Sequence, residues 1–153
     1  MKRRSFLFLA VLTVYILVFG AQTVLASAGP DSRGVYRPTI YINGEKQALT
    51  AAIPPSGSTL VPFRAFFSAL KMDAQFDNQP KTVTAKNNDT TVTLTAGKKI
   101  ATLNGKEVQL LQGPELVDDG LIYVNLRFIA EAFGGKVQFD KANLTIQIDF
   151  QNK

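Results

Sequence analysis

Cysteine and histidine are both absent from this chain of 153 residues. Without cysteine the chain can form no disulfide, no thiolate metal ligand and no lipid-anchored cysteine. Without histidine it lacks the side chain that most often acts as a general base or binds a transition metal. We therefore expect no catalytic residues, no cofactor and no metal site, because carboxylates alone bind copper and zinc poorly and unselectively.

The positive charge of the chain is concentrated at its N-terminus. The formal net charge is +5, but Lys2, Arg3 and Arg4 contribute three of the basic residues. Without them, 14 basic residues stand against 12 acidic ones, which leaves a net charge of about +2. Scattered lysines on a nearly neutral domain are typical of a solvated surface, so we expect no nucleic-acid partner.

Residues 1–28 have the pattern of a secretory signal peptide. A basic start precedes an apolar run at residues 6–20, and Ala-Ser-Ala at 26–28 matches the site after which signal peptidase cleaves. The alternative is an uncleaved membrane anchor, since the apolar stretch can be extended through Leu25 to a spanning length. We expect a secreted, extracellular protein that contacts the membrane only if this signal stays uncleaved.

The remainder of the chain contains a unit that occurs twice. Residues 60–77 align with residues 123–140 when the sequence is shifted by 63 positions. This shift places Arg64 on Arg127 and Asp77 on Asp140. A repeat of this length predicts an internal duplication of one supersecondary unit. Each half, of about 50 residues, would bury too little surface alone, so we expect one folded unit with pseudo-twofold symmetry.

Apolar residues recur at i, i+3, i+4 and i+7 in both copies, which predicts one short helix in each. They are Phe63, Phe66, Phe67 and Leu70 in the first copy, and Leu126, Ile129, Ala130 and Phe133 in the second. Pro62 and Asn125 suit the starts of these helices, and Gly134 suits the end of the second.

Alternation with a period of two predicts strands around the helices. Asn43-Gly44 and Asn104-Gly105 predict tight hairpins, and threonines alternate with Val and Leu between residues 82 and 95. With about eight to ten short strands, the predicted fold is α+β, with antiparallel meander sheets packed on two short helices. We expect residues 29–37 to be a flexible lead-in and residues 38–150 to be the domain.

Two motifs in these units carry a family resemblance. Residues 60–64 read LVPFR, and residues 124–135 read VNLRFIAEAFGG. With the Asn-Gly hairpins and the proline loops before each helix, the chain resembles the copper amine oxidase N-terminal-like domain, also called a stalk domain. The resemblance covers about residues 38–149. Asn125 departs from the family pattern, because the family usually has proline at that position. Phe76 and Phe139 also depart from it, because they lie where the family often has tryptophan.

The resemblance implies an extracellular, non-catalytic domain, common in secreted and surface proteins of Gram-positive bacteria. In copper amine oxidases this region is an accessory stalk, and the catalytic part needs histidine ligands for copper. We therefore expect a non-catalytic module that binds or scaffolds at the cell envelope, with wall polymer or another surface protein as its partner. The alternatives are a secreted inhibitor or assembly partner, a dimer formed by strand addition, and a small carboxylate-based hydrolase.

Four charged residues are the main candidates for a structural role. Arg64 and Arg127 lie in the first helical turn, where a cation faces the positive end of the helix dipole and usually has a partner. Asp77 and Asp140 follow at equal distances, so we expect two structural ion pairs, Arg64–Asp77 and Arg127–Asp140. A bound carboxylate or phosphate is the alternative partner.

Two smaller groups of residues are candidate ligand contacts. Tyr36 and Tyr41 flank the first predicted strand and are candidates for stacking on sugar rings. Glu115, Asp118 and Asp119 form the densest acidic cluster. Asp-Asp-Gly before a strand is ordinary turn chemistry, with weak calcium binding and glycoside hydrolysis as alternatives.

Overall fold

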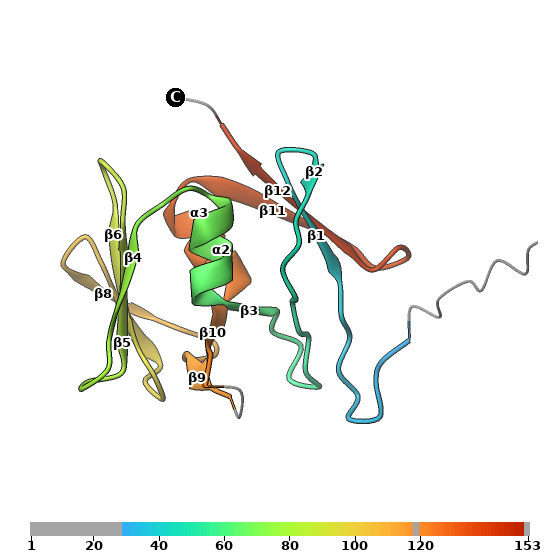
Figure 1. The fold of residues 1–153 in the computed structure, drawn as a ribbon, viewed down its shortest axis with the longest axis horizontal. Coiled ribbons are helices and arrows are strands. Elements are labelled where there is room, and N and C mark those ends of the chain that lie inside the picture. The colour runs from blue at the N-terminus through green and yellow to red at the C-terminus, as the bar shows by residue number, and fades with distance from the viewer. Residues whose placement is uncertain (1–28, 118–119, 152–153) are drawn as a thin grey trace, which may run out of the picture.

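Two short helices lie between β-sheets in the computed structural model, which describes residues 29–117 and 120–151. Figure 1 shows the helices with a five-stranded sheet on one side and a four-stranded sheet on the other. The helices are α2 (Phe63–Ala69) and α3 (Leu126–Ala132). The strands are β1 (Thr39–Ile42), β2 (Glu45–Lys46), β3 (Leu60–Pro62), β4 (Ala74–Asp77), β5 (Thr82–Lys86), β6 (Thr91–Thr95), β7 (Ile100–Leu103), β8 (Lys106–Gln109), β9 (Glu115–Leu116), β10 (Ile122–Asn125), β11 (Gly135–Asp140) and β12 (Thr145–Phe150).

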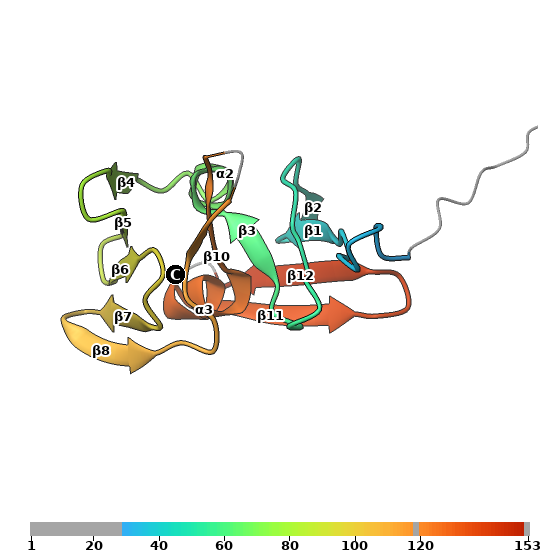
Figure 2. The ribbon, with the colours of Figure 1, turned by 90° about the horizontal axis from the view of Figure 1, so that it is seen from below.

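The described strands form three sheets, which Figure 2 shows from a second side. The five-stranded sheet is an antiparallel meander in the order β4-β5-β6-β7-β8, and β3-β10-β9 form a small antiparallel sheet. The four-stranded sheet has the order β11-β12-β1-β2, with β1 and β12 parallel. The α+β prediction is confirmed. The described ranges contain twelve strands, two more than the upper limit of the expected eight to ten. Two of the twelve, β2 and β9, have only two residues each.

The order strand, helix, hairpin occurs twice, as β3-α2-β4-β5 and as β10-α3-β11-β12. The two hairpins have the same register, since Asp77 pairs with Thr82 and Asp140 pairs with Thr145. In addition β3 and β10 pair antiparallel, with Val61 opposite Val124, its counterpart at the 63-residue shift. This pairing is what a pseudo-twofold arrangement requires, while the duplication itself stays a prediction.

The hairpin that precedes each unit in the chain joins the sheet of the other unit. The β1-β2 hairpin precedes α2 in the chain, yet β1 pairs with β12, which follows α3. The β7-β8 hairpin precedes α3, yet it joins the sheet of β4 and β5 through β6. Neither unit therefore has a complete sheet of its own.

The core lies where the two large sheets meet the helices. Val83 and Ala85 on β5 and Val92 and Leu94 on β6 are buried, and their threonine neighbours face outward, as the alternation predicts. The helices bury six side chains, namely Phe63, Phe66, Phe67, Leu126, Ile129 and Ala130. Rings of the two units meet at Phe67 and Phe133, edge to face with centroids 5.6 Å apart. The described residues include no buried polar or charged side chain.

Local signals for helix ends and turns are confirmed. The Asn125 side chain accepts a hydrogen bond from the Phe128 N–H at 3.0 Å, which caps α3. Gly134 ends α3 with a φ of 83°. The hairpin residues Asn43 and Asn104 both have positive φ, as does the glycine after each, which fits a type I′ turn.

Candidate functional site

A surface groove of about 770 Å³ lies where the ends of both helices meet the tips of two hairpins. Figure 1 shows the end of α2, the β1-β2 tip and the β5-β6 tip at the same end of the molecule. We call it the helix-end groove. Its lining residues are Ile42, Asn43, Glu45, Gln47, residues 69–72, residues 87–90, residues 131–134, Phe150 and Gln151.

The lining of the helix-end groove combines acidic, amide and apolar side chains. Glu45, Asp89 and Glu131 outnumber the single basic residue, Lys71. The last carbonyl groups of both helices add partial negative charge at this end. Half-buried apolar side chains supply a second kind of surface, namely Leu70, Met72, Phe133 and Phe150. The groove therefore has hydrogen-bonding groups beside apolar contact area, without a cluster of cations.

The prediction that Arg127 forms an ion pair with Asp140 is wrong. The Arg127 Nη1 atom lies 3.1 Å from Oε1 of Glu131, four residues along the same helix, and 3.4 Å from the Val137 carbonyl oxygen. Asp140 instead accepts hydrogen bonds from the backbone N–H of Ala142 and from the backbone and side chain of Asn143. The side-chain and backbone N–H groups of Asn143 lower the Asp140 pKa. The Asp140 carboxylate thus stabilises its own turn.

The predicted Arg64–Asp77 pair is also absent from the ion pairs of the described residues. The Arg64 guanidinium lies over the Phe63 ring, with its carbon 5.7 Å from the ring centroid, a cation–π contact. The Asp77 carboxylate accepts a hydrogen bond from the Gln79 N–H at 3.0 Å. Both aspartates therefore serve the tight turns that follow their strands, and a local partner replaces the distant arginine.

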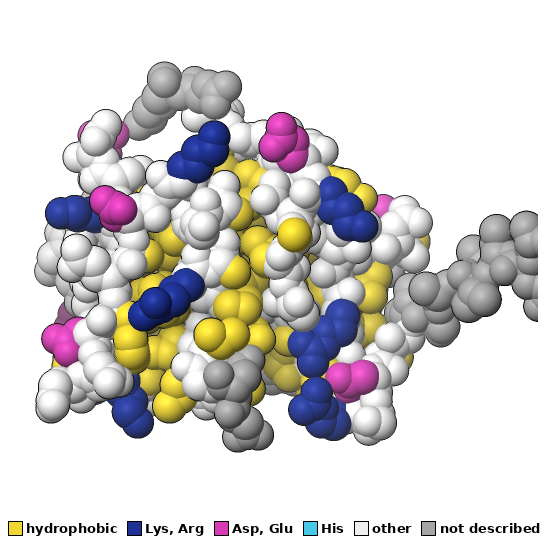
Figure 3. Space-filling view, in the orientation of Figure 1, with side chains coloured by type: hydrophobic (Ala, Val, Ile, Leu, Met, Phe, Trp, Pro, Cys, Tyr) yellow, Lys and Arg dark blue, Asp and Glu magenta, His cyan; other side chains and the backbone are white. Residues whose placement is uncertain are grey.

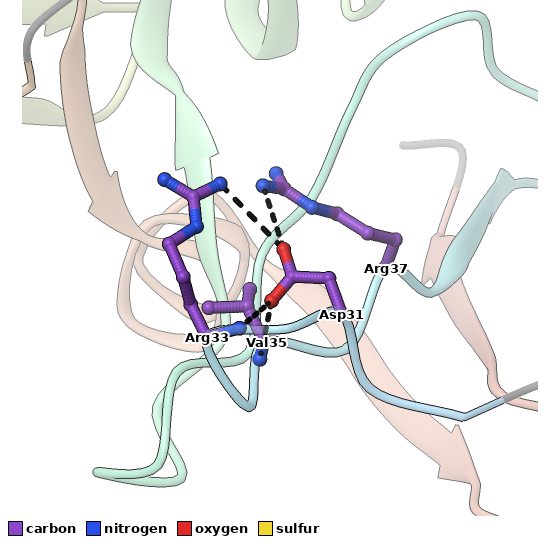
Figure 4. A network of polar contacts seen from close by, with 4 residues as sticks. All are labelled: Asp31, Arg33, Val35 and Arg37. Atoms are coloured by element: carbon purple, nitrogen blue, oxygen red, sulfur yellow. Dashed lines mark hydrogen bonds and ion pairs between the residues drawn. The ribbon is translucent and has the colours of Figure 1, made fainter.

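Asp31 organises the segment that precedes β1 (Figure 4). Its Oδ1 atom accepts hydrogen bonds from the N–H groups of Arg33 and Val35, at 2.9 and 3.1 Å. Its Oδ2 atom lies 3.6 Å from the Arg33 guanidinium and 3.7 Å from that of Arg37. The N–H groups of Val35 and Arg33 lower the pKa of Asp31 most, and the two guanidinium groups add to this effect. Sequence reasoning did not single out this residue, although Asp followed by Ser-Arg-Gly is a recognisable turn signal.

The candidate tyrosines lie outside the helix-end groove. Tyr36 is 39% exposed and its backbone pairs with Ile53, while Tyr41 is half-buried on β1. In the acidic cluster, Glu115 accepts a hydrogen bond from Gln112 at 2.7 Å, and Asp118 and Asp119 lie outside the described residues. Over the described ranges, no group of three Asp, Glu, His or Cys residues is placed to hold a metal ion.

On the face drawn in Figure 3, charged side chains are mixed rather than gathered by sign. Figure 3 shows Lys and Arg across one face, interspersed with Asp and Glu and with apolar patches between them. None of the helices in residues 29–117 and 120–151 has the length and hydropathy needed to cross a bilayer.

Two strand–helix–hairpin units that share their sheets define a small α+β domain with a groove where the helices end. The family model for the copper amine oxidase N-terminal domain matches residues 40–148, and the chain belongs to this family. That domain is a stalk-like, non-catalytic part of the oxidases. No curated protein and no solved structure gives a significant match to the chain.

Proposed function

We propose that this chain is a secreted, non-catalytic binding module of the bacterial cell envelope, and that its helix-end groove binds wall glycan. The family supports a non-catalytic role, and the signal-like sequence of residues 1–28 supports export. The observation that carries the proposal is the groove itself, because it combines polar and apolar lining in a space of about 770 Å³.

The lining favours a neutral sugar polymer over a phosphate polymer. Asn43, Gln47, Asn88 and Gln151 carry amides, which both donate and accept hydrogen bonds and so suit hydroxyl groups. The apolar side chains suit the C–H faces of sugar rings. An anionic polymer would meet three carboxylates and one ammonium group, a net repulsion that the overall charge of about +2 does not offset locally.

Co-sedimentation with purified wall sacculi tests this function. We expect the chain from residue 29 onward to pellet with sacculi at low salt, both before and after chemical removal of the anionic polymers. At 0.5 M salt the Debye length is about 4 Å, so binding should be reduced but not abolished. If binding is lost when the anionic polymers are removed, the ligand is a phosphate polymer and not the glycan. Protein that stays in the supernatant even at low salt would refute wall binding and favour a protein partner.

Paired substitutions assign the binding to the groove. Gln47→Ala with Asn88→Ala removes two amides from the lining, and we expect at least a several-fold loss of sedimentation. The matched control is Gln75→Ala with Gln109→Ala, two exposed glutamines on β4 and β8 outside the groove. Equal loss in both pairs would show that the groove is not the binding surface.

A further inference from the structure

Strand β11 forms one edge of the four-stranded sheet. It pairs with β12 on one side and has no strand on the other among the described residues. Figure 2 shows β11 along the outer margin of this sheet. An edge strand of six residues presents a row of backbone groups to which another strand can pair.

The hydrogen bonds of β12 show which groups of β11 point outward. The Ile148 carbonyl accepts from the Asn43 N–H, and the Phe150 N–H donates to the Asn43 side chain, so both groups face away from β11. Backbone N–H and carbonyl groups alternate in direction along antiparallel strands, and residues that pair point theirs the same way relative to the ladder between them. Because Val137 pairs with Ile148, its N–H and carbonyl groups also point out of that ladder, away from β12. The Arg127 guanidinium, 3.4 Å from the Val137 carbonyl oxygen, confirms this direction. Phe139 lies two residues further along β11, so its backbone N–H and carbonyl groups also point away from β12.

An antiparallel pair of β11 strands centred on Gln138 is self-complementary. In this register Val137 of one copy lies opposite Phe139 of the other, and the outward groups of these two residues hydrogen-bond to each other. Lys136 lies opposite Asp140, so unlike charges meet on the exposed face of the sheet. The twofold symmetry of the pair makes each contact occur twice.

The same register also covers an exposed ring. Phe139 is 41% exposed, although its strand partner Ile146 is buried. The equivalent ring on β4 is Phe76, which packs against Phe63 with centroids 6.2 Å apart. Val137 of a second copy would contact Phe139 from the open side and remove part of this apolar area from water.

The equivalent edge strand, β4, is not self-complementary. Its sequence from residue 73 reads DAQFD, against KVQFD from residue 136 on β11. Pairing two β4 strands about Gln75 would place Asp73 opposite Asp77, and like charges directly opposite each other are destabilising. Lys136 is therefore the charged residue that distinguishes the two edges.

We propose that two copies of this protein associate by antiparallel pairing of their β11 strands, which joins two four-stranded sheets into one of eight strands. The contact is small, so we expect a weak dimer with a dissociation constant on the order of 0.1–1 mM. Such a dimer would form where molecules are concentrated on a surface. The proposal is independent of the helix-end groove, which β11 does not line.

Analytical ultracentrifugation of the chain from residue 29 onward, between about 10 µM and 2 mM, tests the proposal. We expect the weight-average mass to rise from monomer toward dimer, and the amide signals of Val137 and Phe139 to shift with concentration. A mass that stays monomeric over the whole range would overturn the proposal.

Backbone variants locate the contact. Val137→Pro removes an outward N–H without breaking a bond to β12, and we expect it to weaken dimerisation at least tenfold. Ala74→Pro makes the same change at the equivalent outward position of β4 and should leave dimerisation unchanged. The opposite result for this pair would assign the contact to β4 and refute the proposal.

Charge variants test the register. Lys136→Asp places like charges opposite each other and should abolish dimerisation, whereas Lys106→Asp makes the same change in net charge on β8 and should not. Arg127→Ala frees the Val137 carbonyl oxygen, so we expect dimerisation to be at least as strong as in the unaltered chain. Dimerisation unaffected by Lys136→Asp would refute the register.

Discussion

Asp31 holds a turn together with one carboxylate, so the turn should depend on pH. Hydrogen bonds from Val35 and Arg33 and the nearby guanidinium groups lower its folded-state pKa below the ordinary value of 3.8. A lowered pKa means that the stabilisation is fully present above 3.8 and is lost as the pH falls through the folded value. We expect the carboxyl carbon of Asp31 to titrate in NMR with a midpoint below 3.8. A midpoint at or above that value would contradict the assignment.

A matched control separates the carboxylate from the backbone turn. Asp31→Asn keeps one acceptor oxygen for the N–H groups but removes both ion pairs. We therefore expect the amide signals of Arg33 and Val35 in this variant to be insensitive to pH between 2 and 5, a range chosen to bracket the ordinary aspartate pKa. Asp140, whose carboxylate holds a similar turn and whose pKa is also lowered, should titrate in the variant as it does in the unaltered chain and serves as an internal reference.

At the scale of elements, the two helices end in the same conformation with different residues. Gly134 after α3 has a φ of 83°, and Lys71, its counterpart after α2, has a φ of 54°. A left-handed backbone is strained for lysine and unstrained for glycine. We expect Lys71→Gly to stabilise the domain by about 0.5–1 kcal/mol, after the greater flexibility of glycine in the unfolded chain is deducted. In thermal unfolding this corresponds to a rise in Tm of roughly 2–6 °C.

The reverse substitution is the control. A Cβ atom added at Gly134 would meet nothing within 4 Å, so Gly134→Ala reports the backbone conformation alone. We expect it to destabilise the domain by about 1 kcal/mol. Changes of the same sign in both variants would show that the left-handed conformation does not determine their effects.

Local elements could be predicted from the sequence, whereas long-range partners could not. The spacing of Phe63, Phe66 and Phe67 predicts a helix because neighbouring turns present one apolar face, and α2 follows that pattern. The parallel pairing of β1 with β12 joins strands from opposite ends of the domain, and no local pattern encodes it. Arg127 illustrates the same limit for a site, because a flexible exposed side chain pairs with the carboxylate that local geometry brings nearest, which is Glu131.

For the whole molecule, the exchange of hairpins makes the two units depend on each other. Without residues after 95, β1 has no β12, β6 has no β7 and β3 has no β10. Phe67 also loses the ring of Phe133, and the apolar faces of the remaining sheet are exposed to water. The strands left in such a fragment would form only a two-stranded hairpin and a three-stranded meander, together with one helix of seven residues.

We therefore expect a fragment of residues 29–95 not to fold cooperatively, whereas residues 29–153 should. A seven-residue helix is far below the length of about 12–15 residues at which isolated helices become stable, and an isolated hairpin is marginal in water. Scanning calorimetry should give a single heat-absorption peak for residues 29–153 and none for the fragment. Mixing the fragment with residues 96–153 should restore a peak, because the missing strands then return to both sheets. A cooperative transition in the isolated fragment would show that the first unit is stable without the second, contrary to the shared sheets.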